Sequence, residues 1–267
     1  MSEAMDDASA VVVVMQAGPV GIIELARPEK FNCLSSAALA AIEAAFDRFE
    51  EPGSGVRAVL IRAQGKHFCT GADLTEVLEL RTDAARLRRF IGTAHRVLKR
   101  LEASDLPVVA ACQGLALAGG LELMLACDVV LAARDARFGD QHAQFGLLPG
   151  FGGSQRLPRI VGLRRGMDMF FSARWLDAET ALQWGLVNQM VEPEALHAAA
   201  LDYCNTLATR SRVGLATMKR FARQGMEGSL AAGLTLEEEL VSVALLDADV
   251  SEGLAAFQAR RTPQFKA

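Results

Sequence analysis

Short runs of apolar, mostly β-branched residues recur along the chain and predict β-strands. These runs occupy residues 11–15, 20–25, 56–61, 108–111 and 128–132. Their length and their content of valine and isoleucine are typical of strands that are buried in a sheet. We therefore expect these segments to pair in one sheet.

Between the strands, apolar residues return at every third or fourth position, which is the spacing of one buried helical face. Ser36 is expected to cap a helix that ends before residues 52–53. A longer helix is expected over residues 74–101, and its apolar stripe consists of Leu87, Phe90, Ile91, Ala94, Val97, Leu98 and Leu101. Asp177 should begin a further helix, after which the chain becomes almost wholly helical.

The alternation of strands and helices predicts βαβ units, with parallel strands and helices packed outside them. The expected fold class is therefore α/β. We divide the chain into a disordered tail over residues 1–9, an α/β core over residues 10–200, and a helical C-terminal segment over residues 201–267.

Composition narrows the class of protein. The chain of 267 residues is 51% hydrophobic and 22% charged, which is typical of a globular protein, and its net charge of −4 argues against a nucleic-acid partner. No apolar run approaches the roughly 20 residues of a membrane-spanning helix, so no membrane partner is expected. The five cysteines form no Cys-x-x-Cys pair, and the N-terminus lacks the basic region of a signal peptide. These features predict a cytoplasmic protein with reduced thiols and without a metal site.

Glycine-bearing stretches are the candidates for chemistry, and they cover residues 65–74, 113–123 and 146–159. Gly114 and Gly119 have the glycine spacing of a phosphate-binding P-loop, but no lysine follows them. Residues 150–155 lack the last glycine of a dinucleotide-binding fingerprint. Neither nucleotide motif is present.

The turn over residues 114–120 leads instead into an apolar helix that carries one carboxylate, Glu122. A helix N-terminus leaves backbone N–H groups unpaired, and such groups can stabilise negative charge on a carbonyl oxygen. The turn over residues 70–73 offers a second set of N–H groups. Two ordinary turns would show the same glycines, and Glu122 is equally explained as a carboxylate that stabilises its own helix N-terminus. Both interpretations stay open from the residues alone.

In their order along the chain, HFCTGADL, GLALAGGLEL, CDVVLAARDARFG and LLPGFGGSQRLPRIVG resemble the crotonase (enoyl-CoA hydratase/isomerase) superfamily. ARWLDAETALQWGLVNQMV is similar to a later segment of the same family, and the resemblance runs from about residue 18 to the end. It implies a core that is a ββα superhelix, followed by a helical segment that forms trimers. Because this scaffold serves many reactions, the resemblance is weaker evidence for the reaction than for the fold.

The resemblance implies an acyl-CoA thioester as substrate, without a cofactor other than the CoA that the substrate carries. The N–H groups of Ala72 and Gly119 would form the oxyanion hole. CoA would be bound by residues of this chain and by basic and aromatic residues of a neighbouring subunit, in a homotrimer or a dimer of trimers. The implied CoA-binding residues are Lys30, Phe31, Asp73 and Leu74, together with Phe257 and Arg260 near the C-terminus.

Hydratases of this family use two glutamates, and this chain departs from that pattern at one of them. The first glutamate matches Glu122, whereas His142 stands where the second is expected. An imidazole can give and take a proton near neutral pH, so hydration by a Glu122/His142 pair is our first hypothesis. One alternative is that a single group acts alone in double-bond isomerisation or in thioester or C–C hydrolysis, with Asp140 as a further candidate carboxylate. Another is acyl-CoA binding without turnover. A fourth alternative is that His142 is an exposed loop residue.

Overall fold

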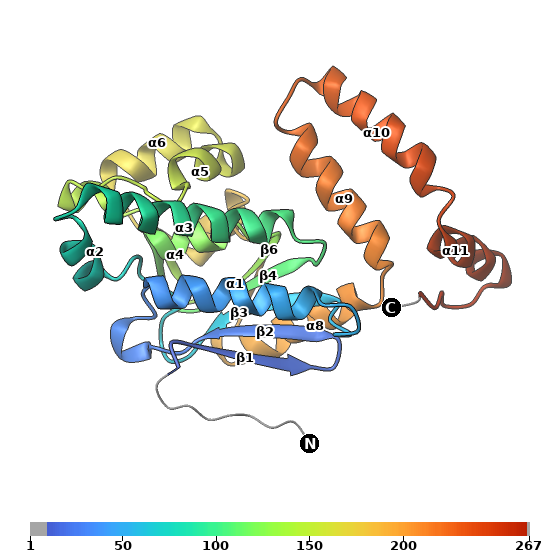
Figure 1. Ribbon diagram of the computed structural model, residues 1–267, viewed down its shortest axis with the longest axis horizontal. Coiled ribbons are helices and arrows are strands. Elements are labelled where there is room, and N and C mark those ends of the chain that lie inside the picture. Colours follow the sequence, from blue (N-terminus) through green and yellow to red (C-terminus); the bar gives the residue numbers. More distant parts are fainter. Residues whose placement is uncertain (1–9, 266–267) are drawn as a thin grey trace.

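The computed structural model describes residues 10–265 and contains two sheets (Figure 1). The larger sheet has six strands in the order β1-β2-β3-β4-β6-β9. β1 and β2 are antiparallel, and all the later neighbours are parallel. The strands are β1 (Val12–Ala17), β2 (Val20–Leu25), β3 (Ala58–Ala63), β4 (Val108–Cys112), β6 (Val129–Ala133) and β9 (Gln189–Val191). Each predicted strand segment is therefore confirmed, with ends that differ by at most two residues.

A second sheet of three strands lies next to the candidate site. It contains β5 (Leu115–Leu117), β7 (Arg137–Gly139) and β8 (Leu176–Asp177) in that order. β5 and β7 are parallel, whereas β7 and β8 are antiparallel. Neither these strands nor β9 were predicted, because strands of two or three residues are too short to show a periodicity.

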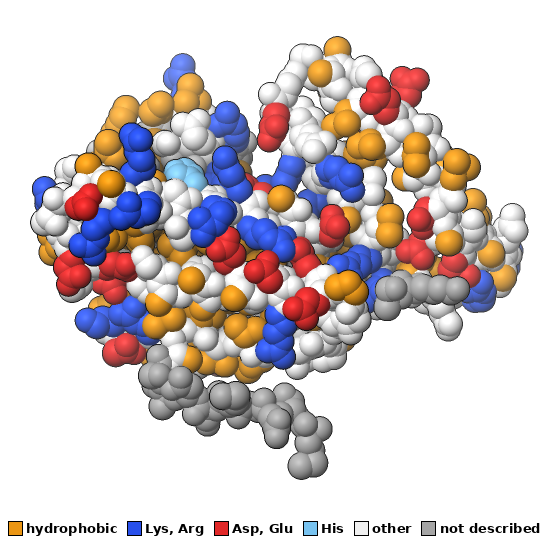
Figure 2. All heavy atoms as spheres, in the orientation of Figure 1, with side chains coloured by type: hydrophobic (Ala, Val, Ile, Leu, Met, Phe, Trp, Pro, Cys, Tyr) orange, Lys and Arg blue, Asp and Glu red, His pale blue; other side chains and the backbone are white. Residues whose placement is uncertain are grey.

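Helices cover the large sheet and bury its strands. α1 (Ser36–Glu50) packs against β1 and β2 and against α3 (Ala84–Ala103), while α8 (Leu196–Ala208) packs against β2, β3, β4 and β6. Every residue of β2 and of β4 is buried, as expected for inner strands of a sheet that is covered on both faces. Ion pairs such as Arg96–Glu43 lie on the outer surfaces of α1 and α3, where Figure 2 shows basic and acidic side chains side by side.

Two predicted helix boundaries are wrong. Ser35, not Ser36, caps α1: its backbone is extended, and its hydroxyl accepts from the Ala38 N–H at 3.2 Å. The single helix expected over 74–101 is two helices, α2 (Leu74–Leu80) and α3. Asp83 separates them, because its backbone is extended, not helical. Its carboxylate accepts from the first N–H groups of α3 and caps that helix.

The remaining helices of the core are short. They are the 3-10 helices η1 (Pro28–Lys30), η2 (His142–Phe145) and η3 (Pro193–Ala195) and the α-helices α4 (Gly119–Leu125), α5 (Gly153–Val161), α6 (Leu163–Ser172) and α7 (Ala178–Gln183). Asp177 caps α7 as predicted, since its carboxylate accepts from the Thr180 N–H at 2.8 Å.

Three C-terminal helices extend away from the sheet (Figure 1). They are α9 (Arg212–Gly225), α10 (Leu230–Ala244) and α11 (Ala248–Ala259). The boundary that we expected at residue 200 is wrong, because it falls inside α8, which packs on the sheet. The segment that leaves the core begins at α9. The tail expected over residues 1–9 lies outside the described residues.

Charged contacts hold α9 to the core, while apolar side chains of the C-terminal helices stay exposed. Lys219 and Arg223 each pair with Asp128 at 2.7 Å. Figure 2 shows apolar side chains along α10 and α11. The largely exposed apolar residues of this segment include Met218, Met226, Leu230, Leu234, Val243, Leu245, Leu246, Leu254 and Phe257. Within residues 10–265, none of the helices has the length and apolar character needed to cross a membrane.

Candidate active site

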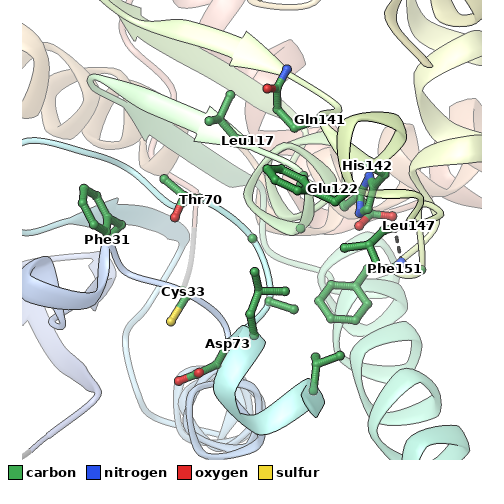
Figure 3. A pocket seen from close by; sticks show the side chains of 18 of the residues that line it. Phe31, Cys33, Thr70, Asp73, Leu117, Glu122, Gln141, His142, Leu147 and Phe151 are labelled. Atoms are coloured by element: carbon green, nitrogen blue, oxygen red, sulfur yellow. Dashed lines mark hydrogen bonds between the residues drawn. The ribbon is translucent and has the colours of Figure 1, made fainter. Parts of the chain in front are cut away.

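A cavity of about 680 Å³ opens in the core between α2, α3, α4 and η2, and Figure 3 shows it from close by. All three glycine-bearing stretches of the sequence contribute to its wall. The predicted site residues of the core all line it, and they are Lys30, Phe31, Ala72, Asp73, Leu74, Gly119, Glu122 and His142. The fold therefore brings together residues from positions 30 to 142 of the chain.

Two backbone amides meet in the wall of this cavity. Gly119 is the first residue of α4, and a Cβ atom on it would lie 3.1 Å from the amide nitrogen of Ala72. Hydrogen bonds of the neighbouring residues hold the Ala72 turn, since the Leu34 N–H donates to the Gly71 carbonyl at 2.8 Å. Neither the Ala72 N–H nor the Gly119 N–H donates to another of the described residues. The geometry thus offers two unpaired donors to one oxygen atom.

Close contact between backbones keeps these two turns in place. A Cβ atom on Gly120 would lie 2.1 Å from the Cys69 carbonyl oxygen, so only glycine fits there. The same carbonyl accepts from the Leu117 N–H at 2.9 Å. Ala118, between β5 and α4, has a φ of 48°. This conformation turns the chain sharply from the strand into the helix.

Glu122 is buried on α4, with a residue exposure of 1%. Its Oε1 accepts from the N–H groups of Phe151 and Gly153, both at 2.7 Å, and Gly153 is the first residue of α5. The carboxylate therefore binds the backbone of the 151–153 turn and not the N-terminus of its own helix. Burial raises the pKa of Glu122 above its ordinary value, although the two amides and the charge of His142 act in the opposite direction.

His142 begins η2 and faces the same cavity. Its side chain is only 11% exposed, and its Nδ1 lies 3.0 Å from Oδ1 of Asp140. Burial lowers the pKa of His142, but the hydrogen bond and charge of Asp140 and the charge of Glu122 outweigh it, so the pKa lies above the ordinary value. The interpretation of His142 as an exposed loop residue is wrong. Figure 3 shows Glu122 and His142 next to each other at one end of the cavity.

Apolar side chains form the deeper wall. Phe90 of α3 and Phe151 contact each other edge to face, with ring centroids 5.6 Å apart. Val77, Leu87, Ile91, Leu147 and Trp175 complete this part of the cavity. Trp175 was not predicted as a lining residue, because a single tryptophan after a helix gives no sequence signal for a place in a cavity wall. Gln141 was missed as well, although it adjoins the predicted His142.

The mouth of the cavity lies near Lys30 and Phe31. Phe31 has a φ of 52°, and its ring stacks on that of His67 at 5.5 Å between centroids. Asp73 binds Arg27 at 3.0 Å, and its other oxygen caps α2, so its side chain is already engaged by the protein. Leu74, the first residue of α2, is more than half exposed. Among the described residues that line the cavity, Lys30 is the one with a lysine or arginine side chain.

Phe257 and Arg260 are not brought to this cavity. They lie at the end of α11, in the segment that extends away from the sheet (Figure 1), and Phe257 is 83% exposed. Their expected contact with the CoA of a neighbouring subunit stays a prediction. Among the described residues, no group of three or more His, Cys, Asp and Glu side chains is placed to hold a metal ion.

Residues 16–267 match the enoyl-CoA hydratase/isomerase family. The chain belongs to this family, and thus to the crotonase superfamily that its motifs indicate. It is 32% identical over 250 residues to the short-chain-enoyl-CoA hydratase of Clostridium acetobutylicum, which covers 94% of this chain and 95% of that protein. A probable enoyl-CoA hydratase of Mycobacterium tuberculosis is 37% identical over 247 residues, 92% of this chain and 94% of that protein.

The fold is also that of solved structures. An enoyl-CoA hydratase from Bacillus anthracis superimposes with a TM-score of 0.91 at 31% identity, over 96% of this chain and 99% of that one. The mixed α/β architecture expected from the sequence is thereby confirmed.

Proposed function

We propose that this protein is an enoyl-CoA hydratase that adds water across the double bond of a 2-enoyl-CoA thioester. The observation that supports it best is the position of two acid–base groups, Glu122 and His142, in one cavity with two unpaired backbone donors. Hydration needs these parts together: a base for water, an acid for carbon, and donors for the thioester oxygen.

The reaction follows from these positions. The N–H groups of Ala72 and Gly119 bind the thioester oxygen and stabilise the enolate that forms when water adds to Cβ, and one such donor is worth about 3 kcal/mol. Glu122 takes a proton from the water as its oxygen bonds to Cβ. His142, as an imidazolium, gives a proton to Cα. The proton on Glu122 then passes through solvent to the neutral His142, so that both groups regain their starting state. The protein needs no cofactor for these steps, because CoA arrives with the substrate.

The substrate would lie with its CoA part at the mouth and its acyl chain against the apolar wall. Lys30, Phe31 and the backbone of Asp73 and Leu74 line the CoA part. We propose that Phe257 and Arg260 reach the CoA of a neighbouring subunit, in a homotrimer or a dimer of trimers. The exposed apolar residues of α9–α11 support an assembly of this kind. The free cysteines support a reducing compartment such as the cytoplasm.

Product analysis with crotonyl-CoA tests the proposed reaction against its alternatives. Hydration removes the absorbance of the conjugated enoyl thioester and yields a product heavier by one water molecule. Hydrolysis releases free CoA, and isomerisation leaves the mass of the substrate unchanged. Binding of short, long and branched enoyl-CoA esters without any turnover would contradict the proposal and indicate a non-catalytic member of the family.

A further inference from the structure

Asp140 lies next to His142 and takes no part in the proposed hydration steps. It is buried, with a residue exposure of 1%. Its Oδ1 accepts from the backbone N–H of His142 at 3.3 Å and lies 3.0 Å from the Nδ1 of the ring. Its Oδ2 is buried and has no hydrogen-bond partner among the described residues. This carboxylate is therefore directed at one imidazole.

Hydrogen bonds hold the backbone that carries Asp140 and His142 close to the turn that carries the Gly119 N–H. Gln141, between the two residues, has a φ of 63°, and its side-chain amide donates to the Ala173 carbonyl at 2.5 Å. The chain just before Asp140 is strand β7, and its last residue, Gly139, accepts from the Ala118 N–H at 2.9 Å. Ala118 precedes Gly119, the donor of the second amide. One backbone hydrogen bond thus joins the segment that carries the imidazole to the turn that begins α4.

Charged groups face the His142 ring from its own segment and α4, and further charges lie on α6. Asp140 and Glu122 act on the ring, and both favour its protonated form. The adjacent α6 carries Arg164, Arg165 and Asp168. Arg165 lies over the Trp184 ring, 5.0 Å from its centroid, and Asp168 pairs with Arg174 at 3.1 Å. The carboxylate that touches the ring is therefore the one on Asp140.

On this geometry we propose that Asp140 is a positioning residue: it holds the Nδ1–H of His142, so that Nε2 is directed to the substrate, and it favours the imidazolium. The proposal rests on the proposed function for its role in turnover. During hydration the N–H bond at Nε2 breaks, a C–H bond forms at Cα, and the ring becomes neutral with its Nδ1–H still donated to Asp140. Asp140 itself gains no proton. Dehydration reverses these steps.

The experiment titrates His142 by 15N NMR of the free, full-length protein, which requires no activity. In the wild-type protein the neutral ring should carry its proton on Nδ1. Asp140→Asn, which keeps the shape but removes the charge, should lower the pKa of His142. Asp168→Asn removes the same charge from an exposed pair on α6 and should leave the pKa unchanged.

Kinetics connect this titration with turnover. Because His142 must be protonated for hydration, kcat/KM should fall as the pH rises through its pKa, and Asp140→Asn should move this alkaline limb to lower pH. We expect kcat to fall about 10- to 100-fold, the cost that loss of an orienting carboxylate has for histidines at metal sites, with little change in KM. Asp168→Asn should retain the wild-type profile.

Two results would overturn the role of Asp140. One is a neutral wild-type ring with its proton on Nε2, a measurement that does not depend on whether Asp140→Asn folds. The other is an Asp140→Asn variant, folded by circular dichroism, with the His142 pKa and the alkaline limb of the wild type. If the NMR results are as expected but no enoyl-CoA is hydrated, the proposed function fails while the Asp140–His142 hydrogen bond stands.

Discussion

At the residue scale, Glu122 and His142 differ in how the protein holds them. Glu122 accepts two short hydrogen bonds from backbone amides at one oxygen, which leaves its other oxygen available to a water molecule. His142 instead has one ring nitrogen engaged by Asp140 and the other available to the substrate. In each group the protein therefore engages one atom and leaves a second atom for proton transfer.

Glu122→Gln tests the proposed base. The amide oxygen of glutamine can still accept from Phe151 and Gly153, so the fold should be retained, but the side chain can no longer take a proton from water. We expect kcat for hydration to fall by about 100- to 10,000-fold. Steady-state kinetics with crotonyl-CoA measure this loss, and Glu43→Gln, in an exposed pair with Arg96, is the matched control. Full activity of Glu122→Gln would remove this residue from the mechanism.

His142→Ala tests the proposed acid. Truncation removes the proton donor for Cα, so we expect kcat to fall about 100- to 10,000-fold. Binding of a substrate analogue, followed by calorimetry, should change much less, because the oxyanion donors and the apolar wall remain. A hydration rate close to that of the wild type would contradict the pairing of His142 with Glu122, and one group would then act alone.

At the scale of elements, the contact between α4 and the extended segment at Cys69 determines the geometry of the proposed oxyanion hole. Cys69 and Ala116 form a parallel bridge, and Gly120 lies directly against the Cys69 carbonyl. α4 begins at this contact and carries both Gly119 and Glu122. A displacement of the helix would therefore move the proposed donor Gly119 and the proposed base Glu122 together.

Gly120→Ala tests this contact. A Cβ atom 2.1 Å from a backbone oxygen forces α4 away from Cys69, and we expect a loss of about 1–3 kcal/mol in the free energy of unfolding. Gly92→Ala in α3 is the matched control, because its Cβ would meet no atom within 4 Å. Alanine should stabilise that helix by about 0.5–1 kcal/mol. Urea denaturation measures both changes, and an unaltered stability of Gly120→Ala would contradict the close contact.

At the scale of the whole molecule, the C-terminal helices are held to the core at α9 and extend outward from there (Figure 1). α10 has no fully buried residue, and apolar side chains are exposed along it and beyond it. An amphipathic segment of this kind reaches a low free energy when a second surface covers it. We propose another copy of the chain as the partner that covers it.

Leu246→Asp tests this assembly. Leu246 follows α10 and is 84% exposed, so a charge there should leave the subunit folded but oppose its association. We expect light scattering to report a lower molar mass than for the wild type. Leu78→Asp on α2, where the leucine is 61% exposed, is the control and should retain the wild-type mass. A wild-type mass for Leu246→Asp would place the interface elsewhere.

The sequence alone determined the main strands, the buried stripe of α3, the glycine turns and the positions of Glu122 and His142. These features depend on local periodicity and on which residues fit a tight turn, and both can be read along the chain. The short strands were not predicted, because two or three residues show no periodicity. The break between α2 and α3 was not predicted either, because the capping side chain of Asp83 decides it while the apolar pattern continues without a gap.

Only the tertiary structure decided what each candidate side chain does. Glu122 was equally consistent with stabilising its own helix, until packing placed it on the amides of Phe151 and Gly153. His142 was consistent with an exposed loop from the sequence alone. In the structure, Gln141 has a left-handed backbone conformation, and the His142 ring lies against the Asp140 carboxylate. The physical reason is that hydrogen-bond partners and burial depend on which segments meet in space, whereas the sequence specifies only which segments can form.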